Sequence, residues 1–149
     1  MKKGILILIV LTLFNCSEKK NWNNMTPTFD DFSVSKFCNL SVAESNPNFS
    51  DTNLTIEERK EIRKQYLQPN SIYNCEYSII SIQQNDKSWK IYIFSARNGK
   101  FIGQLKSEIG TLFSKQSSLI IIDPTDENGT HGKETEYWIT ENNELRKIK

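Results

Sequence analysis

Apolar and aromatic residues alternate with polar ones through the second half of the chain, and this period of two indicates β-strands. The clearest example is residues 89–94, where Trp89, Ile91 and Ile93 share one face of the expected strand. Turn-forming residues divide this half of the chain into six expected strands: 72–82, 89–94, 101–105, 118–123, 136–140 and 145–148. We therefore expect an α+β or mainly-β fold, an antiparallel β-meander of about six strands with one helix on its N-terminal side.

Two short turns define hairpins within this expected meander. Asn98 and Gly99 both tolerate the positive φ of a type I′ turn, which favours antiparallel pairing of 89–94 with 101–105. Asn142 and Asn143 separate the last two strands, so we expect a second hairpin there.

The expected helix lies before these strands. Thr55 and Glu58 have the spacing of a capping box, in which each side chain accepts a hydrogen bond from the other residue's backbone amide. The pattern predicts a helix over 56–68, ended by Pro69. Residues 29–42 also carry apolar side chains, but their spacing fits either a helix or an extended segment.

A different apolar pattern opens the chain. Lys2 and Lys3 precede an unbroken apolar run over 5–11, and Cys16 follows shortly after it. An apolar core of about ten residues is shorter than the roughly twenty that a membrane-spanning helix needs. The layout is therefore that of a secretory signal that is removed after export.

The residues that end this signal refine the prediction. Leu13-Phe14-Asn15-Cys16 resembles the lipobox of bacterial lipoproteins, and this resemblance implies that Cys16 is lipidated and becomes the first residue of the mature chain. We expect a signal peptide over 1–15, the lipidated cysteine and a flexible tether over 16–27, and a single globular β-rich domain over 28–149. The implied location is the bacterial cell envelope, at the outer membrane. The alternative is an ordinary signal peptide that has a cysteine near its end.

Removal of the signal also changes the charge. Without Lys2 and Lys3 the count of Lys and Arg falls from 19 to 17, against 18 Asp and Glu, so the mature chain is nearly neutral. Such a chain has no basic surplus to neutralise phosphates, and we expect no nucleic-acid partner. The hydrophobic content of the whole chain, 37%, is enough for a modest core.

Three cysteines occur in the sequence. If Cys16 carries lipid, Cys38 and Cys75 remain as an even pair in an oxidising compartment, and a disulfide between them is expected. The alternatives are a catalytic thiol or a metal site, although zinc normally takes four clustered ligands.

The C-terminal half resembles a broad group of uncharacterised secreted bacterial proteins. Their shared motifs are a Pro-Asn junction after a short helix, a D-x-x-T-G-K hairpin, an S-x-L-L-I-V-N-P strand and a closing Y-Y-x-W-x-N-N-x-F. The corresponding residues here are 68–70, 95–100, 118–124 and 136–145. These are turn and core motifs, so the resemblance implies a shared fold rather than an activity. Residues 71–75 replace the F-A-G-H-Y segment of that group, and no role of its histidine transfers to this chain.

Motifs of catalysis are absent from the sequence, which lacks the hydrolase elbow G-x-S-x-G, the H-E-x-x-H motif, the P-loop and G-x-G-x-x-G. We predict no catalytic residue, no metal ligand and no cofactor. Two alternatives stay open. His131, the only histidine, and Asp123 could belong to a small hydrolase site. Oxygen ligands of the 124–134 loop and Asp123 could hold calcium: Asp123, Asp126, Glu127 and Asn128.

Aromatic residues on the strands suggest a different role. Tyr137 and Trp138 are neighbours on one expected strand, so they point to opposite faces and cannot both fill the same core. They either form part of an exposed aromatic patch or pack beneath other segments. Our leading hypothesis is an envelope lipoprotein that binds the membrane through Cys16 and a protein partner through its sheet. The alternative is the small envelope hydrolase with a site near His131 and Asp123.

Overall fold

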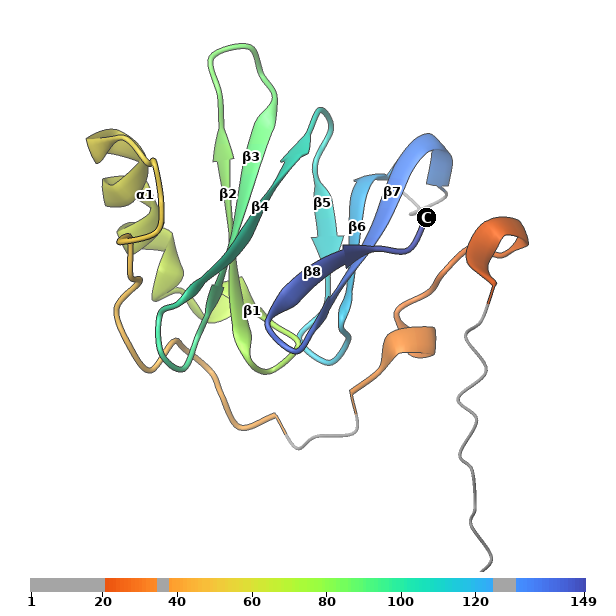
Figure 1. Ribbon diagram of the computed structural model, residues 1–149, viewed down its shortest axis with the longest axis horizontal. Coiled ribbons are helices and arrows are strands. Elements are labelled where there is room, and N and C mark those ends of the chain that lie inside the picture. The colour runs from red at the N-terminus through yellow and green to blue at the C-terminus, as the bar shows by residue number, and fades with distance from the viewer. Residues whose placement is uncertain (1–20, 35–37, 125–130) are drawn as a thin grey trace, which may run out of the picture.

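The computed structural model describes residues 21–34, 38–124 and 131–149, with side chains from 134 onward in the last range. It contains two antiparallel four-stranded sheets, which follow one another along the chain (Figure 1). The first sheet consists of β1 (Ile72–Tyr73), β2 (Tyr77–Gln83), β3 (Trp89–Ser95) and β4 (Phe101–Ser107). The second consists of β5 (Thr111–Phe113), β6 (Leu119–Pro124), β7 (His131–Glu141) and β8 (Glu144–Lys147). The expected class, α+β or mainly β with antiparallel strands, is confirmed.

The strand count differs from the sequence prediction, with eight strands within the described residues in place of six. The expected strand over 72–82 is two strands, because Asn74 and Cys75 adopt positive φ angles of 52° and 55° and reverse the chain. β5 was not predicted because three residues are too few to show a period. It is recognised by its pairing, since Thr111–Phe113 forms an antiparallel hairpin with Ile120–Ile122 of β6.

Helix α1 (Ile56–Tyr66) begins at the predicted capping box. The Glu58 amide donates to Thr55 Oγ1 at 3.1 Å, and the Thr55 amide donates to Glu58 Oε2 at 2.9 Å. The helix ends two residues earlier than expected, and the chain continues into the short 3₁₀ helix η3 (Pro69–Ser71).

The two predicted hairpin turns have different outcomes. Asn142 and Asn143 both adopt positive φ angles, 53° and 62°, and close the predicted β7–β8 hairpin. At the β3–β4 turn only Gly99 does so, at 72°, and a wider loop is closed by a hydrogen bond from Ser95 N to Lys100 O. Tertiary packing explains this difference: a Cβ on Gly99 would lie 2.0 Å from Asn46 O, so the loop is shaped by the segment against which it packs.

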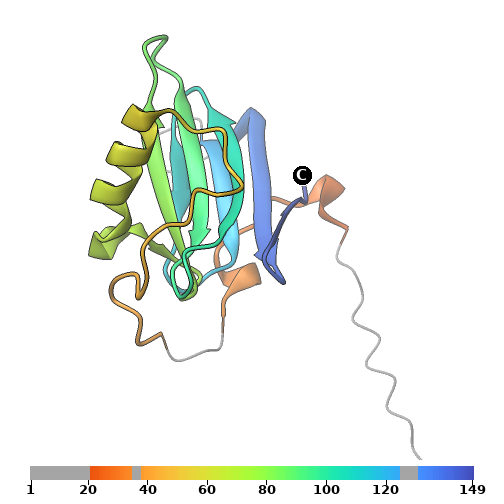
Figure 2. The ribbon, with the colours of Figure 1, turned by 60° about the vertical axis from the view of Figure 1, so that its left-hand side comes forward.

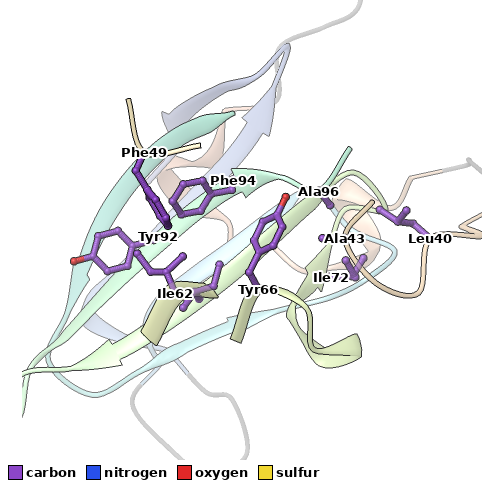
Figure 3. Packing of buried hydrophobic residues seen from close by; sticks show 10 residues of the cluster. Leu40, Ala43, Phe49, Ile62, Tyr66, Ile72, Tyr92, Phe94 and Ala96 are labelled. Atoms are coloured by element: carbon purple, nitrogen blue, oxygen red, sulfur yellow. The ribbon is translucent and has the colours of Figure 1, made fainter. Parts of the chain in front are cut away.

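Alternating side chains of the first sheet fill two separate cores. Ile91 and Ile93 pack between the two sheets, together with residues of β6 such as Ile120. Tyr92 and Phe94 point the other way, where α1 and the segment before it cover the sheet (Figures 2 and 3). This outer core is rich in aromatic rings, including T-shaped pairs of Phe94 with Phe49 and with Tyr66.

The N-terminal segment covers the outer face of the second sheet. Phe29 and Phe32 pack against an apolar cluster of β6 and β7: Leu119, Ile121, Tyr137 and Ile139. Backbone hydrogen bonds fix the segment, including one from Val34 N to Gln116 O at 2.9 Å. We call residues 21–34 the N-terminal strap; it includes the 3₁₀ helices η1 (Trp22–Asn24) and η2 (Asp30–Phe32).

The strap takes in residues 21–27, for which the sequence predicts a tether. Pro27 is fully buried, and the rings of Trp22 and Phe32 lie 5.0 Å apart. The Met25 carbonyl accepts a hydrogen bond from Lys149 Nζ at 3.0 Å. The described part of the predicted tether therefore lies against the domain.

The predicted disulfide between Cys38 and Cys75 is present, with the two Cα atoms 5.2 Å apart. It joins the segment that follows the strap to the tight turn between β1 and β2. None of the helices described is long and apolar enough to cross a membrane.

Candidate functional site

A cleft of about 330 Å³ lies where the first turn of α1 meets the outer face of the first sheet. We call it the α1 cleft. Its walls are the loop 51–54, Glu58 of α1, Lys90 and Tyr92 of β3, and Phe101 and Gln104 of β4. Asp51 and Asn53 are exposed on its rim, whereas Tyr92 is fully buried at its base.

Three polar side chains form a hydrogen-bonded group in this cleft. Glu58 Oε1 accepts from Lys90 Nζ and from Tyr92 Oη, both at 2.8 Å. Glu58 Oε2 accepts a hydrogen bond from the Thr55 amide of the capping box. The Glu58 side chain is only 13% exposed, whereas that of Lys90 is 37% exposed. Local structure explains the arrangement, because helix capping fixes Glu58 and alternation along β3 places Lys90 and Tyr92 on one face.

This group has defined electrostatics. Burial acts to raise the pKa of Glu58, but hydrogen bonds from Lys90, the Thr55 amide and Tyr92 outweigh burial and lower that pKa to about 2. Burial, and then the hydrogen bond to Glu58, raise the pKa of the Tyr92 hydroxyl. Glu58 is therefore a fixed anion near neutral pH and has no proton to donate as a general acid. The half-exposed Lys90 ammonium remains in position to donate to a ligand.

A second, wider cleft of about 570 Å³ contains the aspartate singled out in the sequence. We call it the edge cleft. It lies between β4 and β7, and its polar lining includes Lys106, Glu108, Asp123, Glu134 and Glu136.

Asp123 closes the turn between β4 and β5. Its Oδ1 accepts from Ser107 Oγ at 2.6 Å and from the amides of Glu108 and Ile109, both at 2.8 Å. Asp123 itself adopts a positive φ of 55°, and its amide donates to Gly110 O at 2.9 Å. These bonds explain Asp123 as a turn-closing residue.

Glu136, across the edge cleft, is also held by neighbours. Burial acts to raise its pKa, while hydrogen bonds from Lys147 and from Trp138 Nε1 outweigh burial and lower it. The Trp138 bond measures 2.9 Å. Both Glu136 and Asp123 thus accept hydrogen bonds from neighbouring residues. Of the two, only Asp123 was named in the alternative hydrolase site predicted from the sequence.

The side chains of the other predicted site residues lie outside the part of the chain that the structure describes. His131 begins β7 and pairs with Pro124 through its backbone, but its side chain is not among those described. Cys16, Asp126, Glu127 and Asn128 also fall outside the described residues. Lipidation of Cys16, the hydrolase site and the calcium site therefore stay predictions. Within the described residues, no group of three or more His, Cys, Asp or Glu side chains could hold a metal ion.

The strand aromatics are buried or half-buried rather than exposed, and all of them except Trp89 pack within the hydrophobic cores. Tyr137 and Trp138 lie on opposite faces of β7, as expected. Tyr137 lies beneath the strap, and Trp138 packs against the core between the sheets.

Sequence reasoning missed the α1 cleft. The capping box identifies Glu58, and strand alternation places Lys90 beside Tyr92 on one face. Nothing in the local pattern links Glu58 to Lys90 and Tyr92, which follow it by 32 and 34 positions. Only the packing of α1 on the first sheet brings the three together.

Comparisons with family models, with curated proteins and with solved structures find no match to the chain.

Proposed function

We propose that this chain is an exported bacterial lipoprotein, anchored in the outer membrane by lipid on Cys16, whose folded domain binds a protein partner without catalysing a reaction. The proposed binding surface is the α1 cleft.

Export is supported by the cysteines together with the N-terminal pattern. A disulfide joins Cys38 to Cys75, and such bonds persist in oxidising compartments. Cys16 is the third cysteine, and it stands in the lipobox-like sequence directly after the apolar run. The motifs of the C-terminal half that resemble those of secreted bacterial proteins also favour this location.

The hydrogen-bonded group Glu58–Lys90–Tyr92 is the observation that carries the binding proposal. Its carboxylate is already bonded to three donors and its pKa is about 2, so the group suits recognition better than proton transfer. Lys90 can donate to a carboxylate or carbonyl oxygen of a partner, and the exposed Asp51 and Asn53 extend the polar rim. Preorganised polar groups of this kind bind with little cost in side-chain ordering.

Capture of envelope proteins on the immobilised domain, starting at Ser17, tests the proposal. A specific partner should bind the unchanged domain and be lost from the double variant Asp51→Lys/Asn53→Lys, because two new cations would crowd the rim beside Lys90. Glu108→Lys is the matched control, since Glu108 is exposed on the other cleft, and this variant should keep the partner. Binding that both variants retain would place the contact elsewhere, and the absence of any specific partner would count against a binding domain.

A further inference from the structure

We infer that the end of the molecule formed by η1, Met25 and Lys149 lies on the lipid surface of the membrane. The inference depends on the proposed anchor at Cys16. It adds which surface faces the lipid and therefore which surface faces away from it.

Chain length sets the first limit. Asn21, where the described part of the strap begins, lies five positions after Cys16, with four residues between them. Five residue-to-residue steps of fully extended chain span at most about 18 Å. Asn21 therefore cannot lie farther than this from a lipidated Cys16.

Because the strap is packed on the folded domain, the limit on the distance from Cys16 to Asn21 also limits how far this part of the domain can lie from Cys16. Trp22 packs against Phe32, Pro27 is fully buried, and the Met25 carbonyl accepts from Lys149 Nζ. Phe32 in turn packs on the second sheet, so η1 is held at a fixed position relative to the core. A lipid anchor at Cys16 consequently holds the η1 end near the bilayer.

The chemistry of this end fits a lipid headgroup layer. Met25 is 48% exposed and Trp22 is half-buried, and tryptophan favours the boundary between hydrocarbon and water. Lys149 is exposed beside Met25, where its ammonium can meet lipid phosphates. The exposed asparagines of the same end, Asn21, Asn23 and Asn24, can hydrogen-bond to headgroups without a burial cost.

The opposite end of the molecule is then directed away from the membrane. Figures 1 and 2 place α1 on one side of the two sheets and η1 on the other. With η1 on the lipid, α1 and its cleft face the aqueous side.

Tryptophan quenching tests this orientation. The full-length chain, made in a bacterium that acylates lipoproteins, is placed in vesicles of phosphatidylethanolamine and phosphatidylglycerol that include a phosphatidylcholine with a spin label near its headgroup. The spin label should quench part of the tryptophan emission of the unchanged protein. Trp22→Phe should lose this quenching, because the contact with Phe32 is kept but the reporter is removed. Trp89→Phe is the matched control and should retain it, since Trp89 belongs to β3 of the first sheet.

The possible outcomes separate the orientation from the anchor. Quenching that persists in Trp22→Phe, or is lost in Trp89→Phe, would overturn the orientation. This conclusion applies when the variant still binds the vesicles, measured by co-flotation. Vesicle binding that is unchanged in Cys16→Ser would overturn the anchor, and the orientation with it.

Discussion

At the scale of single residues, the two clefts show carboxylates whose surroundings decide their role. Glu58 and Glu136 each have a pKa that hydrogen bonds lower against the effect of burial. Glu58 also joins two elements, because it caps α1 and accepts hydrogen bonds from two residues of β3. Its ionised state therefore contributes to the stability of the fold as well as to the charge of the cleft.

This link predicts a pH-dependent stability that Glu58→Gln reduces. The folded pKa of about 2 lies below the ordinary value of 4.5, so the stabilisation is fully present above pH 4.5 and is lost as the pH falls towards 2. Glu58→Gln can keep the capping box, but it removes the negative charge that accepts hydrogen bonds from Lys90 and Tyr92. We expect it to lower the free energy of unfolding by about 1–3 kcal/mol at neutral pH. Urea unfolding of both proteins at pH 7 and pH 3 measures the effect.

The variant should lose less stability than the unchanged protein between these two pH values. Glu57→Gln, on the exposed side of the same helical turn, is the control and should behave like the unchanged protein. Equal losses in Glu58→Gln and the unchanged protein would contradict the assigned role.

At the scale of elements, local pattern predicted those features that depend on neighbours in sequence. The capping box at Thr55, the alternation in β3 and the turn at Asn142-Asn143 all follow from residues within a few positions of one another. The failures have different causes: β5 is too short to show a period, whereas the widened β3–β4 loop is defined by contact with the distant segment at Asn46. In the β3–β4 loop, tertiary packing overrides local preference.

The β3–β4 loop provides a test at this scale through Gly99→Ala. The added Cβ would lie 2.0 Å from the Asn46 carbonyl oxygen, and alanine would have to adopt a φ of 72°. Strain and the displaced backbone should together cost about 1–4 kcal/mol in the free energy of unfolding, measured in urea.

Arg97→Ala is the matched control in the same loop. Arg97 is exposed, and its charged group lies 3.9 Å from that of Glu44, a distance at which a surface pair contributes little. We expect this variant to stay within about 0.5 kcal/mol of the unchanged protein. A Gly99→Ala protein that is equally stable would show that the loop can relax away from Asn46.

At the scale of the whole molecule, two connections hold the N-terminal part of the chain on the sheets. The strap covers the outer face of the second sheet, and the Cys38–Cys75 disulfide ties the following segment to the first. The cysteine pair was predicted from a count of three cysteines, because the predicted lipobox accounts for the remaining one. The strap was not predicted, since the spacing of residues 29–42 fitted more than one structure and gave no information on where they would dock.

Removal of the disulfide should destabilise the domain strongly. The two cysteines are 37 positions apart in sequence, and the chain-entropy account gives about 4 kcal/mol for a loop of this length. We expect Cys38→Ala/Cys75→Ala to lower the free energy of unfolding by that order in urea.

Mass spectrometry of the non-reduced protein checks the bridge itself. Free thiols on both cysteines would contradict the disulfide. A double variant as stable as the unchanged protein would show that the bridge does not constrain the unfolded chain.

The strap also has a consequence for the order of folding. It comes early in the chain, yet the Ser117 hydroxyl that bonds to the carbonyls of Phe29 and Phe32 lies 88 and 85 positions later, and the partner of Met25 lies 124 positions later. Contacts over such separations require the intervening chain to be ordered first, because closing a long flexible loop costs entropy. We therefore expect the strap to dock after β6 and β7 have formed a surface, so that an early segment of the domain is among the last to reach its final place.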